Sequence, residues 1–294
     1  MTRPSLTAAL LLCAAPLRAE GIVNVVTTTS DLADFVRAAG GDRVTVDHIA
    51  RGDQNPHFIE VKPSSMMKLR SARVFFMVGL DLERWAQQIV DGSRNAALDV
   101  VDLSAGIAKL EIPARVDASQ GDVHRYGNPH YWLDPRNVRT IMEGIVAALA
   151  KASPEDAAFF RANADAYLGR LEVKIAEWET ALKPLAGRAI VTFHRSWSYF
   201  TAWSGLTVAG EVEPKPGVPP SPSHTAEVIT MVRESGIRAI VVEPFYDTSA
   251  PDQIARSTGA MVLRLPTSVG GVERARDYIA MMEYNVAALV AALR

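Results

Sequence analysis

The tripeptide Asn-Pro-His occurs twice in this chain, as Asn55-Pro56-His57 and as Asn128-Pro129-His130, in segments that otherwise differ. Proline fixes its own φ and disfavours helical backbone at the residue before it. Each Asn-Pro pair is therefore a turn signal, and each histidine is expected on a loop. Because neutral imidazole is a common ligand of Zn²⁺, the two histidines are candidates for one metal site.

A third histidine, His194, follows the apolar run 189–193. In open α/β sheets, ligands bind outside the carboxyl ends of the strands, where all three histidines are expected. Any one of them alone is compatible with a loop cap or a partly buried polar residue, but three at matching places form a zinc-ligand set. The other histidines, His48, His124 and His224, lack this placement, and we interpret them as structural or surface residues.

The elements that must position these histidines follow from the hydrophobic pattern. Apolar runs predict strands at residues 22–27, 43–49, 74–78, 97–104, 189–194, 206–212, 239–245 and 261–266. Helical patterns lie between them at 31–40, 63–71, 80–92, 197–205, 224–236 and 278–294, the first with Ser30 or Asp31 as N-cap. Strands that alternate with helices indicate parallel sheets covered on both faces.

A long helix is predicted in the middle of the chain. Ser153 and Pro154 form a helix start signal, and apolar residues recur at steps of three and four from Phe160 to Leu182. A stiff helix at this place can connect two lobes. We therefore divide the chain into a signal peptide at 1–19, an N-terminal α/β lobe at 20–152, a connecting helix at 153–184 and a C-terminal α/β lobe at 185–294.

The first residues are typical of a secretory signal peptide. Arg3 precedes an apolar run from Leu6 to Leu17 that is too short to cross a bilayer, and Ala19 offers a small residue for cleavage. The only cysteine, Cys13, lies in this segment, and Leu12 is not the small residue that a lipoprotein signal requires. We expect a cleaved, exported protein whose metal site uses histidine and carboxylate. A net charge of −2 without a long basic run argues against a nucleic-acid partner.

Several segments resemble one family of exported proteins. The segment NPHYWLDP is the most specific, and VVTTTSDLADFVRAAGG, NPHFIEVKPSS, FHRSWSYF and VVEPFYD extend the match over nearly the whole mature sequence. Together they resemble the periplasmic zinc/manganese-type solute-binding proteins of metal ABC transporters. The resemblance implies two α/β lobes with parallel sheets joined by a long rigid helix, a metal site in the interlobe cleft, and delivery to a membrane permease. We expect a monomer.

By position, His57, His130 and His194 match the three protein ligands of the zinc-type members. Manganese-type relatives typically have a carboxylate at the third position, so imidazole there favours Zn²⁺ over Mn²⁺. Many relatives also have an aspartate ligand after the last strand, but this chain reads LRLPTSVGG. The fourth ligand is thus Glu243, Asp247 or a water. We favour Glu243 because it ends a strand, although a hydrogen bond to a ligand imidazole is an equally physical role.

Further residues have supporting roles in this interpretation. Glu60 and Asp134 lie close in sequence to ligand histidines and are predicted to orient them. The His-rich loop of many zinc receptors is reduced here to His124.

Two functions fit this site. The first is a receptor that captures zinc in the periplasm. The alternative is a secreted zinc-dependent hydrolase with an open catalytic coordination position. Because the chain has no HExxH motif, we predict a receptor and not an enzyme. An adhesin has no supporting feature in the sequence.

Overall fold

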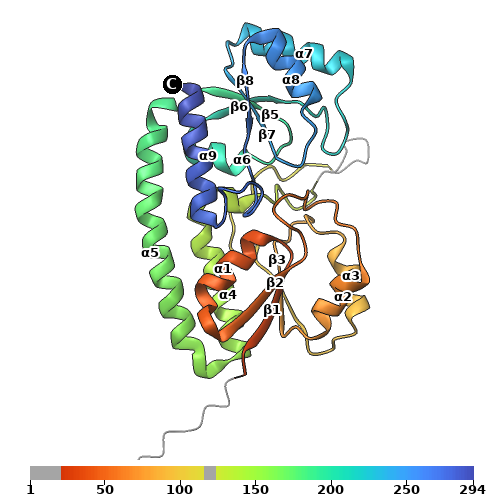
Figure 1. Cartoon of the computed structure of the whole chain (residues 1–294), viewed down its shortest axis with the longest axis vertical. Coiled ribbons are helices and arrows are strands. Elements are labelled where there is room, and N and C mark those ends of the chain that lie inside the picture. The colour runs from red at the N-terminus through yellow and green to blue at the C-terminus, as the bar shows by residue number, and fades with distance from the viewer. Residues whose placement is uncertain (1–20, 116–123) are drawn as a thin grey trace, which may run out of the picture.

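The structure is a computed structural model that describes residues 21–115 and 124–294. The predicted signal peptide lies outside the described residues. Within them, two lobes each contain a four-stranded sheet whose paired strands are all parallel (Figure 1). No helix in the described ranges is both long enough and apolar enough to cross a membrane. The predicted fold class, two α/β lobes with a long helix, is confirmed.

The N-terminal lobe contains a sheet of strand order β2-β1-β3-β4. Its strands are β1 (Val23–Thr27), β2 (Val44–His48), β3 (Val74–Met77) and β4 (Asp99–Asp102). Its helices are α1 (Ser30–Gly40), α2 (Pro63–Arg70), α3 (Ala86–Ser93) and α4 (Val138–Ala152).

Both faces of this sheet are covered, as continuous apolar strands require. Val25 and Phe76 belong to the core cluster that contains α1 and α4. Their neighbours Val26 and Phe75 point to the opposite face and pack with residues of α2 and α3. The alternation follows from the two-residue period of a strand.

The C-terminal lobe repeats this arrangement with the order β6-β5-β7-β8. Its strands are β5 (Ala189–Thr192), β6 (Thr207–Glu211), β7 (Ala239–Val242) and β8 (Met261–Arg264). Its helices are α6 (Ser198–Ser204), α7 (Pro222–Glu234), α8 (Ser249–Thr258) and α9 (Tyr278–Leu293). Short 3-10 helices lie at η1 (Gly41–Arg43), η3 (Tyr131–Leu133), η4 (Pro135–Asn137), η5 (Pro154–Asp156) and η6 (Lys183–Leu185).

The predicted long helix is α5 (Ala157–Leu182), which runs along the side of both lobes (Figure 1). Its apolar stripe is buried as expected, except for the half-buried Ile175. Ser153 does not cap the backbone; its hydroxyl donates to Asp156 Oδ2 at 2.9 Å. At the other end, Trp178 Nε1 donates to Glu283 of α9 at 2.9 Å. One hydrophobic cluster thus extends from the N-terminal sheet through α5 and α9 into the C-terminal lobe.

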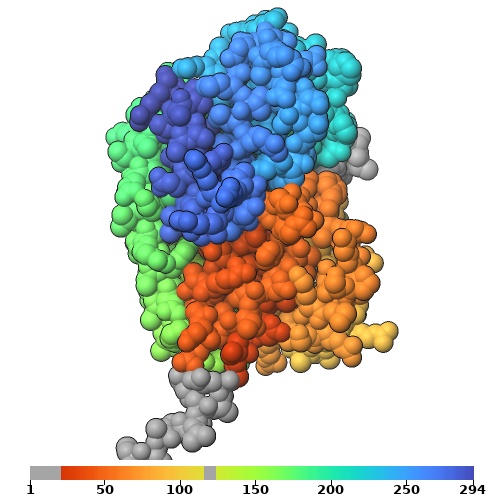
Figure 2. Space-filling model, viewed as in Figure 1, coloured from red at the N-terminus to blue at the C-terminus, as the bar shows by residue number. Residues whose placement is uncertain are grey.

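The two lobes are in direct contact (Figure 2). Ser30 Oγ donates to the carbonyl of Val269 at 2.7 Å, and Asp31 Oδ1 accepts from the Val269 amide at 2.9 Å. At Gly52, an added Cβ would lie 2.0 Å from the Val269 carbonyl oxygen, so only glycine allows the two loops to approach this closely.

Some local expectations were wrong. Helix α1 is capped by Thr29, whose hydroxyl accepts from the Leu32 amide at 3.4 Å, rather than by Ser30 or Asp31. Helices α4 and α8 were not expected from the sequence. Helix α8 is mostly polar and buries only Pro251 and Ile254, although these two residues lie on one face of the helix.

Candidate metal centre

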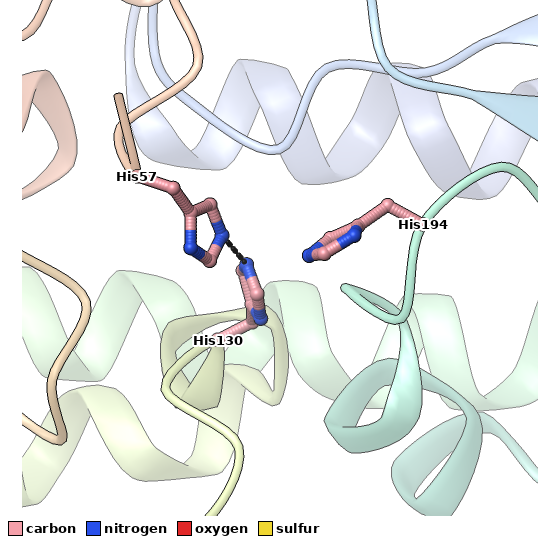
Figure 3. Close-up of side chains that lie close together, drawn as sticks. All are labelled: His57, His130 and His194. Atoms are coloured by element: carbon pink, nitrogen blue, oxygen red, sulfur yellow. Dashed lines mark hydrogen bonds between the residues drawn. The ribbon is translucent and has the colours of Figure 1, made fainter. Parts of the chain in front are cut away.

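The three predicted ligand histidines converge between the lobes (Figure 3). His57 lies on the loop after β2, His130 on the loop after β4, and His194 two residues after β5. One ligand nitrogen from each lies within 4.8 Å of the others, and all three side chains are buried. The structure thus brings these residues together at the carboxyl ends of strands of both lobes, and their binding of a metal stays a prediction.

The repeated Asn-Pro-His tripeptide builds the same turn twice. Asn55 Oδ1 accepts from the His57 amide at 3.0 Å, and Asn128 Oδ1 accepts from the His130 amide at 3.0 Å. The asparagine side chain thereby fixes the backbone amide two residues later. The proline between the two residues has no N–H and so does not compete for the asparagine oxygen. The amide nitrogens of the two asparagines reach the other lobe: Asn55 donates to the hydroxyl of Tyr246 at 3.2 Å and Asn128 to the carbonyl of Arg195 at 2.8 Å.

The spacing of the nitrogens suits a small divalent cation. His57 Nε2 and His130 Nε2 are 3.1 Å apart. Two nitrogens bound tetrahedrally to Zn²⁺ at roughly 2.0–2.1 Å would be about 3.3 Å apart. A small inward movement of His194 would then complete a three-nitrogen set.

The outward nitrogens of two ligands have partners that fix their rings. Asn128 Oδ1 lies 2.9 Å from His130 Nδ1, and Glu213 Oε2 lies 2.8 Å from His194 Nδ1. Each partner accepts a hydrogen bond from the Nδ1–H group, which leaves Nε2 for a metal. Burial and the neighbouring histidines hold the pKa of His130 well below its ordinary value, so this ligand is neutral and ready to coordinate.

Glu243 lies at the end of β7 and is fully buried, outside the group of three histidines. Its Oε1 accepts from Trp197 Nε1 at 3.2 Å. Burial raises the pKa of Glu243 to about 7, and the charge of a protonated His194 acts in the opposite direction. Asp247 is exposed and accepts from the Ser249 amide at 2.8 Å. Direct ligation by Glu243 therefore stays a prediction.

Two residues near the site were not expected there. Glu213, which follows β6, was not identified, although it comes after a strand next to that of His194. His124 was interpreted as a structural or surface residue, but its ring centroid lies 5.0 Å from that of His57 and it is half-buried.

Conversely, Glu60 and Asp134 have other partners than the ligand histidines they were predicted to orient. Glu60 is exposed and pairs with Lys62 at 3.4 Å, and Asp134 pairs with Arg136 at 2.7 Å.

A cavity of about 460 Å³ adjoins the histidines. Residues of both lobes line it, among them Glu111, His124, His130, His194, Arg195 and Lys215. This space is wide enough for a hydrated ion to approach the nitrogens.

Comparison with known proteins places this geometry in a family context. A family model described as ZnuA, zinc-uptake complex component A, periplasmic, matches residues 25–292. The manganese-binding lipoprotein MntA of Halalkalibacterium halodurans is 30% identical over 280 residues, covering 93% of this chain and 89% of that protein. The zinc-binding protein AdcA of Streptococcus pyogenes is 25% identical over 289 residues, covering 92% of this chain but only 56% of that longer protein.

Solved structures agree with the fold. A crystal structure of ZnuA superposes with a TM-score of 0.82 at 25% identity, covering 93% of this chain and all of the other. A manganese-bound periplasmic metal-binding protein from Candidatus Liberibacter asiaticus superposes with a TM-score of 0.77 at 21% identity, covering 92% of this chain and all of that one.

Proposed function

This chain belongs to the ZnuA family of metal-binding solute-binding proteins, and we propose that it is a periplasmic receptor that captures zinc in preference to manganese and delivers it to the permease of an ABC transporter. The observation that carries the proposal is the convergence of His57, His130 and His194 from two lobes into one buried group. A metal held by both lobes can be presented to a second protein at the cleft between them.

The donor set supports zinc. The relatives are named for different metals, manganese for MntA and zinc for AdcA, so family membership alone favours neither. Three imidazole nitrogens suit Zn²⁺, whereas Mn²⁺ prefers carboxylate, carbonyl and water oxygens. Glu243 remains the preferred fourth ligand, with Asp247 or a water as alternatives; if it coordinates, the site still has a majority of nitrogen donors.

A binding role fits the surroundings of the site better than catalysis. A zinc hydrolase needs a base beside the metal-bound water. Of the two buried carboxylates near His194, Glu213 is engaged with His194 Nδ1 at 2.8 Å, and we assign Glu243 to the metal itself rather than to a metal-bound water. We propose that residues 1–19 are a signal peptide that directs export and is then cleaved, and that the mature protein is a monomer.

Titration calorimetry of the metal-free mature protein tests this function. We expect one Zn²⁺ per chain, bound more tightly than Mn²⁺. His194→Ala should weaken zinc binding by more than the roughly 10–100-fold typical of residues behind the ligands. The matched control is His224→Ala, because His224 lies in the same lobe with its Nε2 on the carbonyl of Glu211 at 3.0 Å. A stoichiometry near zero, tighter binding of Mn²⁺, or zinc-dependent hydrolysis of generic esters or peptides would contradict the proposal.

A further inference from the structure

We propose that Glu213 is a positioning residue of the metal site, whose carboxylate fixes His194 and supplies the negative charge that makes three neutral imidazoles selective for zinc over manganese. This inference rests on the proposed function, because it concerns how the same site chooses its metal. It is carried by the register of two strands, the burial of the carboxylate and the contrast between the partners of two ligand histidines.

A shift in register brings Glu213 beside His194. In the pairing of β5 with β6, Ile190 lies opposite Val208, but Val191 lies opposite Gly210, so that Ala209 is an extra residue. The shifted register continues past the strands, where the Glu213 amide donates to the Phe193 carbonyl at 3.0 Å. Without the extra residue, Val212 would occupy the position level with His194, and a one-residue slip would turn Glu213 to the other face.

The carboxylate is held in a fixed place. Glu213 is only 6% exposed, and its Oε2 lies 2.8 Å from His194 Nδ1. The same oxygen accepts from the Gly217 amide at 3.4 Å, in the proline-rich segment that follows. Since the Glu213 backbone continues the sheet and its oxygen has two donors, the side chain cannot easily turn away from the imidazole.

The partner of His194 differs in kind from the partner of His130. His130 Nδ1 faces the neutral amide oxygen of Asn128, whereas His194 Nδ1 faces a carboxylate. A hydrogen bond to a charged acceptor is stronger, and it makes the imidazole a more basic ligand through its other nitrogen. A better nitrogen donor favours Zn²⁺ more than it favours Mn²⁺, which prefers oxygen.

Two variants separate the charge from the hydrogen bond. Glu213→Gln keeps a hydrogen-bond acceptor and removes the charge, while Glu213→Ala removes both. Glu211→Gln is the matched control, since Glu211 lies two residues earlier and its carboxylate pairs with Arg195 at 3.1 Å rather than with one of the three clustered histidines. For each full mature chain, we would measure the dissociation constants of Zn²⁺ and Mn²⁺ by competition with chelators of known affinity. The Nδ1 proton of His194 would be observed by NMR of the histidine-labelled protein.

We expect Glu213→Ala to weaken Zn²⁺ binding by roughly 10–100-fold, as is typical for the loss of a partner behind a ligand. Glu213→Gln should weaken it less, and Mn²⁺ binding should change less than Zn²⁺ binding in both variants. The protected Nδ1 proton of His194 should be lost in Glu213→Ala and unchanged in Glu211→Gln.

Two results would overturn the inference. One is zinc binding within twofold of the parent in both variants; the other is an equal loss of affinity for both metals. Thermal melting of the metal-free variants checks that they are folded. If a variant is destabilised, unchanged NMR signals of His57 and His130 show that the rest of the site is intact. A parent chain that binds no metal would refute the proposed function instead, so the two failures are distinguishable.

Discussion

Glu243→Gln should stabilise the metal-free protein and weaken its hold on zinc. Glu243 is fully buried, and its pKa is raised from 4.5 to about 7 because burial disfavours the charged form. A carboxyl group whose pKa is raised by folding contributes stability below its unfolded pKa, and that contribution is lost as the pH rises through 7. The shift corresponds to about 3 kcal/mol above pH 7, at 1.36 kcal/mol for each pKa unit. Glutamine has a similar shape, carries no charge, and can still accept from Trp197.

The variant should therefore exceed the parent by less than about 1 kcal/mol near pH 5 and by about 3 kcal/mol near pH 8.5. Zinc affinity should change in the opposite direction, because a cation on His194 favours the ionised carboxylate nearby. Urea unfolding of the metal-free proteins at both pH values measures the first effect, and calorimetry at neutral pH measures the second. X-ray absorption of the zinc-loaded parent would reveal direct ligation as an oxygen at roughly 2.0–2.2 Å.

Glu234→Gln is the control, since Glu234 is an exposed carboxylate at the end of α7 in the same lobe and its loss should change neither quantity by much. A stability difference between Glu243→Gln and the parent that is the same at both pH values would refute the account of Glu243 as a desolvated acid. Unchanged zinc affinity would show that Glu243 neither ligates nor assists the metal.

Three further outcomes follow from the structure. Acidification from pH 7.5 to 5 should release zinc, because protons compete with the metal for the imidazole nitrogens; a flat zinc affinity would contradict this. Gly52→Ala should lower the free energy of unfolding, measured with urea, by about 1–3 kcal/mol and should weaken zinc binding, because the added Cβ would collide with the Val269 carbonyl. Gly169→Ala is the control and should be harmless, because a Cβ at Gly169 would have no atom within 4 Å. X-ray scattering curves of metal-free and zinc-loaded protein should nearly superimpose because α5 braces both lobes, and a large compaction on loading would refute that.

Most of the fold was predictable because its signals are local. The strands are short apolar runs, and the stripe from Phe160 to Leu182 has a period that only a helix satisfies. Helix α4 has the same kind of spacing and could have been found in the same way. Helix α8 was missed as well, although its buried residues Pro251 and Ile254 lie three positions apart on one face. The cap of α1 was misplaced by one or two residues because Thr29, Ser30 and Asp31 are all good N-caps, and only the backbone conformation distinguishes them.

The candidate site was predictable to the extent that single loops determine it. Asn-Pro turns and the ends of parallel strands were enough to bring three histidines together. Glu213 was not predictable, since its place beside His194 depends on a register shift between β5 and β6. The position of His124 depends on the path of the long loop after β4, which no local pattern sets. Partners across a sheet edge or along a long loop are tertiary properties.

The shared core beneath α1, α5 and α9 bears on how the chain acquires its structure. Helix α9 is the last element along the chain, yet it completes the cover of the first helix: the rings of Phe35 and Tyr278 lie 4.8 Å apart, and Asp34 accepts from the Tyr278 amide at 2.9 Å. The core of the N-terminal lobe is thus completed by a helix from the far end of the described residues. Folding of the two lobes should therefore be coupled into a single cooperative event, which coincident urea transitions of signals from the two lobes would reveal.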